Sequence, residues 1–122
     1  GVEPSLAAVR KGCDLGLANK EALVAAGRIV MDAARTSGAR IIPIDSEHSA
    51  VFQAMRSGNG PAEVSKVVLT ASGGPFREWS SEKMGTATVE DALAHPTWTM
   101  GRKVTIDSAS LMNKGLELIE AH

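Results

Sequence analysis

Two carboxylates, Asp45 and Glu47, follow an apolar segment at residues 40–44 that is predicted to be a strand. On an extended backbone, residues two apart point to the same side, so both carboxylates would face one way. Neighbouring carboxylates repel unless a cation neutralises them, and hard divalent cations such as Mg2+ and Mn2+ take oxygen ligands of this kind. The alternative is that Asp45 or Ser46 caps the next helix and Glu47 favours its first turn. These residues alone leave both interpretations open.

The last predicted helix carries a polar face at helical spacings of three and four. That face is formed by Ser110, Asn113, Lys114 and Glu117. If it borders a pocket, Glu117 supplies a third oxygen ligand, while Ser108, Asn113 and Lys114 hold an anion. The alternative is a solvated face with an exposed Lys–Glu pair, which contributes little to stability.

The segment Ser72-Gly73-Gly74 follows another apolar run and has the composition of a phosphate-binding turn. Glycines let backbone N–H groups approach an anion, and a serine hydroxyl donates a hydrogen bond to it. Many ordinary turns have the same composition. The chain has no G-x-G-x-x-G and no Walker-type loop. If a nucleotide binds, its main phosphate-binding loop is therefore expected to lie outside this chain.

A loop at residues 95–101 carries Trp98 between proline and glycine. Such a loop is either a lid that excludes water from a site or a surface loop that its indole holds on the core. His95, at its start, is the best candidate for a donor that titrates near neutral pH. His48 lies in a predicted helix and is expected to be structural.

The elements that position these residues alternate between strands and helices. Strands are predicted at residues 13–18, 40–44, 66–71 and 103–106, and helices at 4–10, 20–36, 46–56, 89–94 and from 108 or 109 onward. Continuous apolar strands joined by helices predict an α/β protein with a largely parallel sheet and a right-handed first crossover. Ligands bind beyond the carboxyl ends of such strands, and each predicted strand is followed by polar or glycine-rich residues.

Composition narrows the class of protein. The chain has 122 residues, a formal net charge of -1, 43% hydrophobic residues and one cysteine. Cys13 rules out an internal disulfide framework and is expected to pack in a strand as a small hydrophobe. The balanced charge argues against a nucleic-acid surface, and no apolar run reaches the length of a membrane span. A length of ~120 residues allows one ordinary domain or pieces of two. The absence of an initiator methionine and the end inside a predicted helix suggest that the chain is not a whole protein.

Five motifs together resemble the 1-deoxy-D-xylulose 5-phosphate reductoisomerase family, in family order and over essentially the whole chain. They are Leu17-Ala18-Asn19-Lys20-Glu21, Pro43-Ile44-Asp45-Ser46-Glu47-His48-Ser49-Ala50-Val51-Phe52-Gln53, Ala71-Ser72-Gly73-Gly74-Pro75-Phe76, His95-Pro96-Thr97-Trp98-Thr99-Met100-Gly101-Arg102-Lys103 and Asp107-Ser108-Ala109-Ser110-Leu111-Met112-Asn113-Lys114-Gly115-Leu116-Glu117. The resemblance implies rearrangement of 1-deoxy-D-xylulose 5-phosphate and its reduction with NADPH to 2-C-methyl-D-erythritol 4-phosphate, in isoprenoid biosynthesis. It also implies that residues 1–45 end a Rossmann-like NADPH-binding domain and that 46–122 begin an α/β catalytic domain.

The resemblance also implies roles for individual residues. The implied ligands of Mg2+ or Mn2+ are Asp45, Glu47 and Glu117, which with Lys20 and His95 form the implied catalytic set. The implied substrate contacts are Lys20, Ser46, Ser72, His95, Trp98, Ser108, Asn113, Lys114 and Glu117. The implied NADPH contacts are Asn19, Glu21 and Gly101, and the loop with Trp98 is the implied flap over the substrate.

The family further implies a homodimer in the bacterial cytoplasm, or in the plastid of a plant or alga, with no nucleic-acid or membrane partner. The chain alone is expected to be inactive because its nucleotide loop is absent. Two other functions stay open from the residues themselves. One is a non-catalytic module that binds a sugar phosphate. The other is a metal-dependent sugar-phosphate isomerase or aldolase that uses no nicotinamide.

Overall fold

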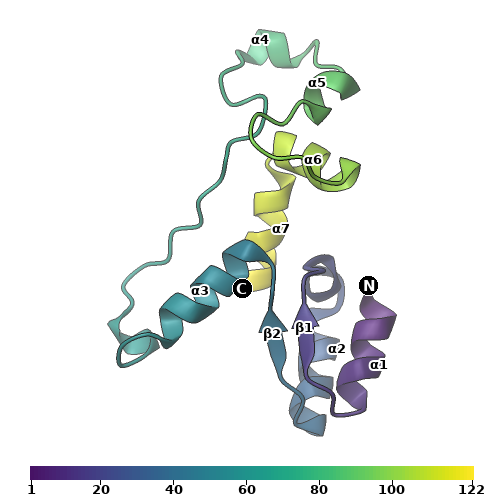
Figure 1. Cartoon of the computed structure of the whole chain (residues 1–122), viewed down its shortest axis with the longest axis vertical. Helices are drawn as coiled ribbons and strands as arrows, with labels where there is room; N and C mark the ends of the chain where they lie inside the picture. The colour runs from purple at the N-terminus through teal and green to yellow at the C-terminus, as the bar shows by residue number, and fades with distance from the viewer. The chain divides into compact units, whose positions relative to one another are not determined.

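A computed structural model describes all residues from Gly1 to His122 (Figure 1). The chain divides into two compact units. Unit 1 contains residues 1–68 and 116–122, and unit 2 contains residues 69–115. The last helix, α7 (Met112–Ala121), contributes residues to both. Among the helices, none combines the length and the apolar character that a bilayer-spanning segment requires.

Unit 1 begins as predicted with a strand–helix–strand arrangement. Its first elements are α1 (Val2–Arg10), β1 (Leu15–Leu17), α2 (Glu21–Ser37) and β2 (Ile41–Pro43). The strands pair in parallel, Leu15 opposite Ile41 and Leu17 opposite Pro43, and lie side by side in Figure 1. The α/β class and the parallel pairing are therefore confirmed, with shorter strands than expected.

The core of unit 1 lies between α1 and α2. Val9 from α1 and Val30 from α2 are fully buried, and Ala34 lies beside them. Val30 and Ala34 are four residues apart, so they share one face of α2. Full burial of one valine contributes about 1.5–3 kcal/mol. Gly38 ends the helix with a φ of 78°, the left-handed conformation in which glycine has no side-chain penalty.

A polar clamp joins the segments that enter the two strands. Asp14 precedes β1 and Arg40 precedes β2; the backbone N–H of Arg40 donates to Asp14 Oδ1 at 2.8 Å and its Nε to Oδ2 at 2.9 Å. These hydrogen bonds hold the pKa of the Asp14 carboxyl below its usual range. The clamp joins the two chain segments just before the first residue pair of the ladder, Leu15 and Ile41, so it helps to set the register that brings residues 45–47 to their place.

Replacing Asp14 by asparagine is expected to lower the melting temperature of the full-length protein at neutral pH. Since the folded-state pKa is depressed, this stabilisation is present above the unfolded pKa, near 3.8, and is lost as the pH falls through the folded value. Thermal unfolding measured from pH 7 down to pH 3 should show the two proteins converging. A constant difference across that range would contradict the assignment of the effect to the carboxylate.

Helix α3 (Ser46–Arg56) matches the prediction and is followed by a single 3-10 turn, η1 (Pro61–Glu63). Unit 2 contains α4 (Ser81–Met84), α5 (Val89–Leu93), α6 (Arg102–Ala109) and the start of α7. The predicted capping box of Thr88 and Asp91 is present at the start of α5, and α5 packs against α6.

Two predicted strands are wrong. Residues 66–71 form no strand, and Val67 and Val68 are 47% and 70% exposed. β-branched residues favour a strand only where a partner strand and a buried face exist. Residues 103–106 belong to helix α6, in which Lys103 and Asp107 form an i,i+4 ion pair at 2.7 Å. Val104 and Ile106 are two residues apart, which is the spacing of a strand, although both lie in a helix.

Two further expectations are corrected. Cys13 lies outside β1 and is exposed, because the chain turns after α1 before the strand begins. The final helix begins at Met112, so Ser110 ends α6 and is not on the polar face of α7. Leu111 separates the two helices with a φ of 61°, which breaks the helical repeat between Ser110 and Asn113.

Candidate functional site

Asp45 occupies the N-cap position of α3, yet its side chain makes no capping hydrogen bond. Its Oδ2 instead accepts from Lys20 Nζ at 2.5 Å. Glu47 lies in the first turn of the same helix, where its Oε2 accepts from the Ser46 hydroxyl at 2.5 Å. Asp45 thus sits where a cap would sit but turns its carboxylate to another partner. The capping interpretation of Asp45 is wrong for the side chain.

Lys20 lies at the N-terminus of α2 and is 8% exposed. Its Nζ contacts Asp45 Oδ2 and also lies 3.3 Å from Glu117 Oε1. Burial by itself lowers the pKa of Lys20, but the hydrogen bonds and charges of Asp45 and Glu117 outweigh it, so the net pKa is raised. A buried ammonium without carboxylates would lose its proton readily; here it stays charged between the two acids.

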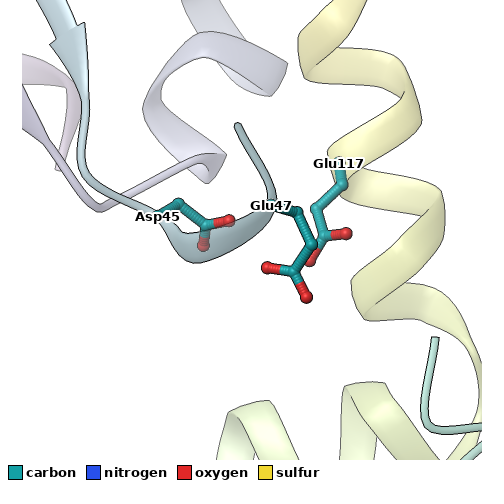
Figure 2. Close-up of side chains that lie close together, drawn as sticks. All are labelled: Asp45, Glu47 and Glu117. Atoms are coloured by element: carbon teal, nitrogen blue, oxygen red, sulfur yellow. The ribbon is translucent and has the colours of Figure 1, made fainter. Parts of the chain in front are cut away.

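The three carboxylates predicted as metal ligands converge in unit 1. Oxygen atoms of Asp45, Glu47 and Glu117 lie within 4.8 Å of one another, two from the start of α3 and one from α7 (Figure 2). Glu117 is fully buried. The sequence placed Glu117 70 positions beyond Glu47 (117 − 47), so only the fold brings it there.

The donor set of this cluster fits a hard divalent cation. All three ligands are oxygen atoms, which Mg2+ and Mn2+ prefer. When the three carboxylates are ionised, negative charge gathers at one point, where a divalent cation would be stabilised in addition to the Lys20 ammonium. Asp45 Oδ1 is buried and accepts no hydrogen bond within the chain, so it retains a lone pair for a metal.

Two groups beside the cluster were not predicted as site residues. His48 Nδ1 lies 3.2 Å from Glu120 Oε2 and 3.6 Å from Asp45 Oδ1, and its Nε2 lies 3.0 Å from the Glu117 carbonyl. Burial raises the pKa of Glu120; the charge of His48 opposes that rise and the charge of Asp45 adds to it. The available signal was spacing: His48 is three residues after Asp45, and Glu120 three after Glu117.

Ser72 and His95, two of the implied substrate contacts, lie together in unit 2. Ser72 Oγ lies 3.1 Å from His95 Nε2 and accepts from the Gly74 backbone N–H at 3.2 Å. His95 Nδ1 accepts from the backbone N–H groups of Thr97 and Trp98 at 3.2 and 3.0 Å. Nδ1 therefore carries no proton and Nε2–H donates to Ser72. With two bonds accepted, the Ser72 hydroxyl hydrogen is directed to another acceptor, which suits an oxyanion.

The two contacts of His95 can be separated by substitution. Asparagine keeps an acceptor near the Nδ1 position, whereas glutamine keeps a donor near the Nε2 position. In the full-length protein, His95→Asn is expected to raise about 10-fold the KM for the sugar phosphate that the family resemblance implies, which is the value of one good hydrogen bond. His95→Gln should instead speed amide exchange in the peptide 95–101, followed by mass spectrometry. If both variants change both quantities alike, the two contacts are not separate.

The remaining predicted residues lie on the surfaces of both units. In unit 2, Ser108 is half-buried in α6, Asn113 and Lys114 are half-buried on α7, Gly101 is the N-cap of α6 and Trp98 is 65% exposed. In unit 1, exposed Asn19 precedes α2 and half-buried Glu21 begins it. The exposure of Trp98 shows that its indole does not hold the loop on the core.

Comparison with known proteins gives one consistent match. A family profile described as the 1-deoxy-D-xylulose 5-phosphate reductoisomerase C-terminal domain matches residues 41–122, and one described as 1-deoxy-D-xylulose 5-phosphate reductoisomerase matches residues 1–27. The reductoisomerase of Geotalea uraniireducens is 56% identical over 99% of this chain and 31% of its own length. That of Rhodopseudomonas palustris is 59% identical over 99% and 30%. The chain therefore spans about a third of these bacterial relatives.

Solved structures show the same likeness. A DOX-P reductoisomerase in complex with NADPH, fosmidomycin and magnesium is 47% identical, with a TM-score of 0.87 over 98% of this chain and 32% of that one. The reductoisomerase of Zymomonas mobilis in complex with NADPH is 50% identical, with a TM-score of 0.85 over 99% and 30%. At these identities the likeness extends to sequence as well as fold.

Proposed function

Since the chain belongs to the 1-deoxy-D-xylulose 5-phosphate reductoisomerase family, we propose that it is a segment of an enzyme that converts 1-deoxy-D-xylulose 5-phosphate to 2-C-methyl-D-erythritol 4-phosphate. The reaction uses NADPH and Mg2+ or Mn2+, and it serves isoprenoid biosynthesis. The observation that carries the proposal is the convergence of Asp45, Glu47 and Glu117 beside Lys20. A module that only binds a sugar phosphate has no use for three carboxylates around one point.

In this proposal Asp45, Glu47 and Glu117 hold the metal ion. When bound, the metal supplies Lewis-acid stabilisation of charge that develops on vicinal oxygens of the ketose. Lys20 keeps Asp45 and Glu117 in place through its two contacts. It also adds a fixed positive charge close to the reacting oxygens, where preorganised charge is most effective. Ser46 contributes a hydroxyl beside Glu47.

The substrate's phosphate is bound, in this proposal, by residues of unit 2. These are Ser72, His95, Ser108, Asn113 and Lys114. The hydrogen bonds around Ser72 support its role because they leave the hydroxyl hydrogen to donate. A phosphate fixed away from the reacting carbons orients the substrate. The loop with exposed Trp98 closes over it and excludes water from the aldehyde intermediate.

The cofactor contacts and the domain assignment are proposed on the family resemblance. Asn19, Glu21 and Gly101 contact NADPH, residues 1–45 end the NADPH-binding domain, and 46–122 begin the catalytic domain. The bacterial relatives support a place in the bacterial cytoplasm. The enzyme acts as a homodimer, and the 122-residue chain by itself does not turn over substrate.

Oxidation of NADPH by the full-length protein tests the proposed function. Absorbance at the nicotinamide band is expected to fall only when the ketose phosphate and Mn2+ are both present. Consumption of the ketose phosphate without NADPH oxidation would instead indicate an isomerase or aldolase. No consumption, with the sugar phosphate bound, would indicate a binding module. The isolated 122-residue chain serves as the inactive control.

A further inference from the structure

Three polar atoms in unit 1 are buried, face one another and have no hydrogen-bond partner. They are Asp45 Oδ1, His48 Nδ1 and Glu120 Oε2. The His48 nitrogen lies 3.2 Å from the Glu120 oxygen and 3.6 Å from the Asp45 oxygen. The exposed fractions of the three side chains are 14%, 10% and 5%. Buried polar atoms are nearly always paired, so three unpaired atoms at one place need an explanation. Neither His48 nor Glu120 has a role in the proposed function.

The other ring nitrogen of His48 connects the cluster to α7. Nε2 lies 3.0 Å from the backbone carbonyl of Glu117. A carbonyl only accepts, so Nε2 carries the hydrogen and the ring orientation is fixed. His48 on α3 therefore contacts the residue that bears the third carboxylate, Glu117, and through Nδ1 it faces Asp45. One imidazole touches two of the three proposed ligand residues.

Apolar packing does not fix α3 by itself. No residue of α3 is buried, whereas α7 contributes the buried residues Leu116 and Glu117. A helix that buries little apolar surface gains little orientation from the hydrophobic effect. The polar contacts of His48 connect the start of α3 to α7, and that start carries both Asp45 and Glu47.

We propose that His48 and Glu120 are positioning residues of the metal site. Glu120 packs on the Nδ1 side of the imidazole, 3.2 Å from it, and keeps the ring in place, while the Nε2–H of the ring holds the start of α3 against the backbone carbonyl of Glu117. Groups behind the ligands commonly act in this way, and their loss typically weakens metal binding about 10–100-fold. The inference rests on the proposed function, because it takes the three carboxylates to be the ligands.

The Mn2+ affinity of the full-length protein tests the proposed role of His48 and Glu120. The electron paramagnetic resonance signal of free Mn2+ falls on binding, so a titration gives Kd without any turnover. Glu120→Gln and His48→Gln are each expected to weaken Mn2+ binding at least about 10-fold. Glutamine at position 48 keeps a donor for the Glu117 carbonyl and removes Nδ1, so it is the milder change to the fold. Gln53→Ala, on the exposed part of α3, is the matched control and should bind as the wild type does.

Further measurements on the same variants decide the outcome. At saturating Mn2+, kcat should return to within a few-fold of the wild-type value, because all three ligands remain. The double variant should lose no more affinity than either single variant, since the two residues act as a unit. Unchanged Kd in both single variants overturns the inference, and so does complete loss of binding in Glu120→Gln, which would make Glu120 a ligand. If the wild type binds no Mn2+, the proposed function itself fails.

Discussion

Replacing Lys20 by methionine is expected to destabilise the metal-free full-length protein by about 3 kcal/mol or more. Lys20 Nζ is the cation that contacts both Asp45 and Glu117, at 2.5 and 3.3 Å, and Glu117 is fully buried. Methionine fills similar space without charge, so Asp45 and Glu117 lose the ammonium that contacts both of them in a low-dielectric site. Breaking a buried pair from one side is costly for this reason.

The loss of stability in the Lys20→Met protein is expected to depend on the metal and hardly on pH. Excess Mn2+ should restore much of the stability by binding only the folded state. Since the pKa of Lys20 is raised on folding, its ion pairs are fully present below the unfolded value, near 10.5, and are lost only as the pH rises through the folded value. Urea unfolding should therefore give the same difference at pH 7 and pH 9.

The control for Lys20 is Lys11→Met, which removes an exposed lysine after α1. It should change the free energy of unfolding by less than about 0.5 kcal/mol. Equal stability of the Lys20→Met protein and the wild type in the presence of a chelator would contradict the account of Lys20 as a counter-charge.

Replacing Gly74 by alanine is expected to destabilise unit 2 by about 3 kcal/mol and to weaken binding of the sugar phosphate. Gly74 has a φ of +67°, which costs an L-residue roughly 1 kcal/mol. A Cβ there would lie 2.7 Å from the carbonyl oxygen of Ser108 and 3.0 Å from Ala109 Cα. Both are backbone atoms that cannot turn away, so overpacking adds about 1–3 kcal/mol.

Gly38→Ala separates the cost of the left-handed backbone conformation from the cost of overpacking. Gly38 has a φ of +78° at the end of α2, but nothing lies within 4 Å of a Cβ built there. It should lose only the roughly 1 kcal/mol of the left-handed conformation, with KM unchanged. Hydrogen exchange of peptides from residues 69–115, together with KM, measures the effect of Gly74→Ala. An equal effect of both substitutions would show that the approach of Gly74 to Ser108 is not what matters.

Sequence reasoning was most accurate where local chemistry and tertiary packing agree. Helix α2 has its apolar residues at helical spacing and a glycine at its end, and α3 was predicted with the observed limits. The prediction of a strand at residues 103–106 was wrong because Val104 and Ile106 alternate as in a strand, while the i,i+4 pair of Lys103 and Asp107 belongs to a helix. A short β-branched segment does not reveal whether a partner strand exists.

The candidate site, like the fold, could be predicted only in part from the sequence. Asp45 and Glu47 were recognisable from their spacing, but the choice between a cap and a metal ligand depended on where Asp45 turns, which Lys20 decides from another helix. The cluster with Glu117 forms across 70 residues of sequence (117 − 47), and local patterns do not encode such a contact. His48 was expected to be structural, and only its neighbours in space relate it to the proposed ligands.

We infer that Asp45, Glu47 and Glu117 bind one divalent cation. A Mn2+ titration of the full-length protein followed by electron paramagnetic resonance, on the wild type, Glu117→Gln and Asp45→Asn, tests it most directly. We expect one bound Mn2+ in the wild type and an affinity at least about 100-fold lower in each variant, since losing a ligand exceeds the loss of a supporting group. Mn2+ affinities equal to that of the wild type in both variants would contradict the claim.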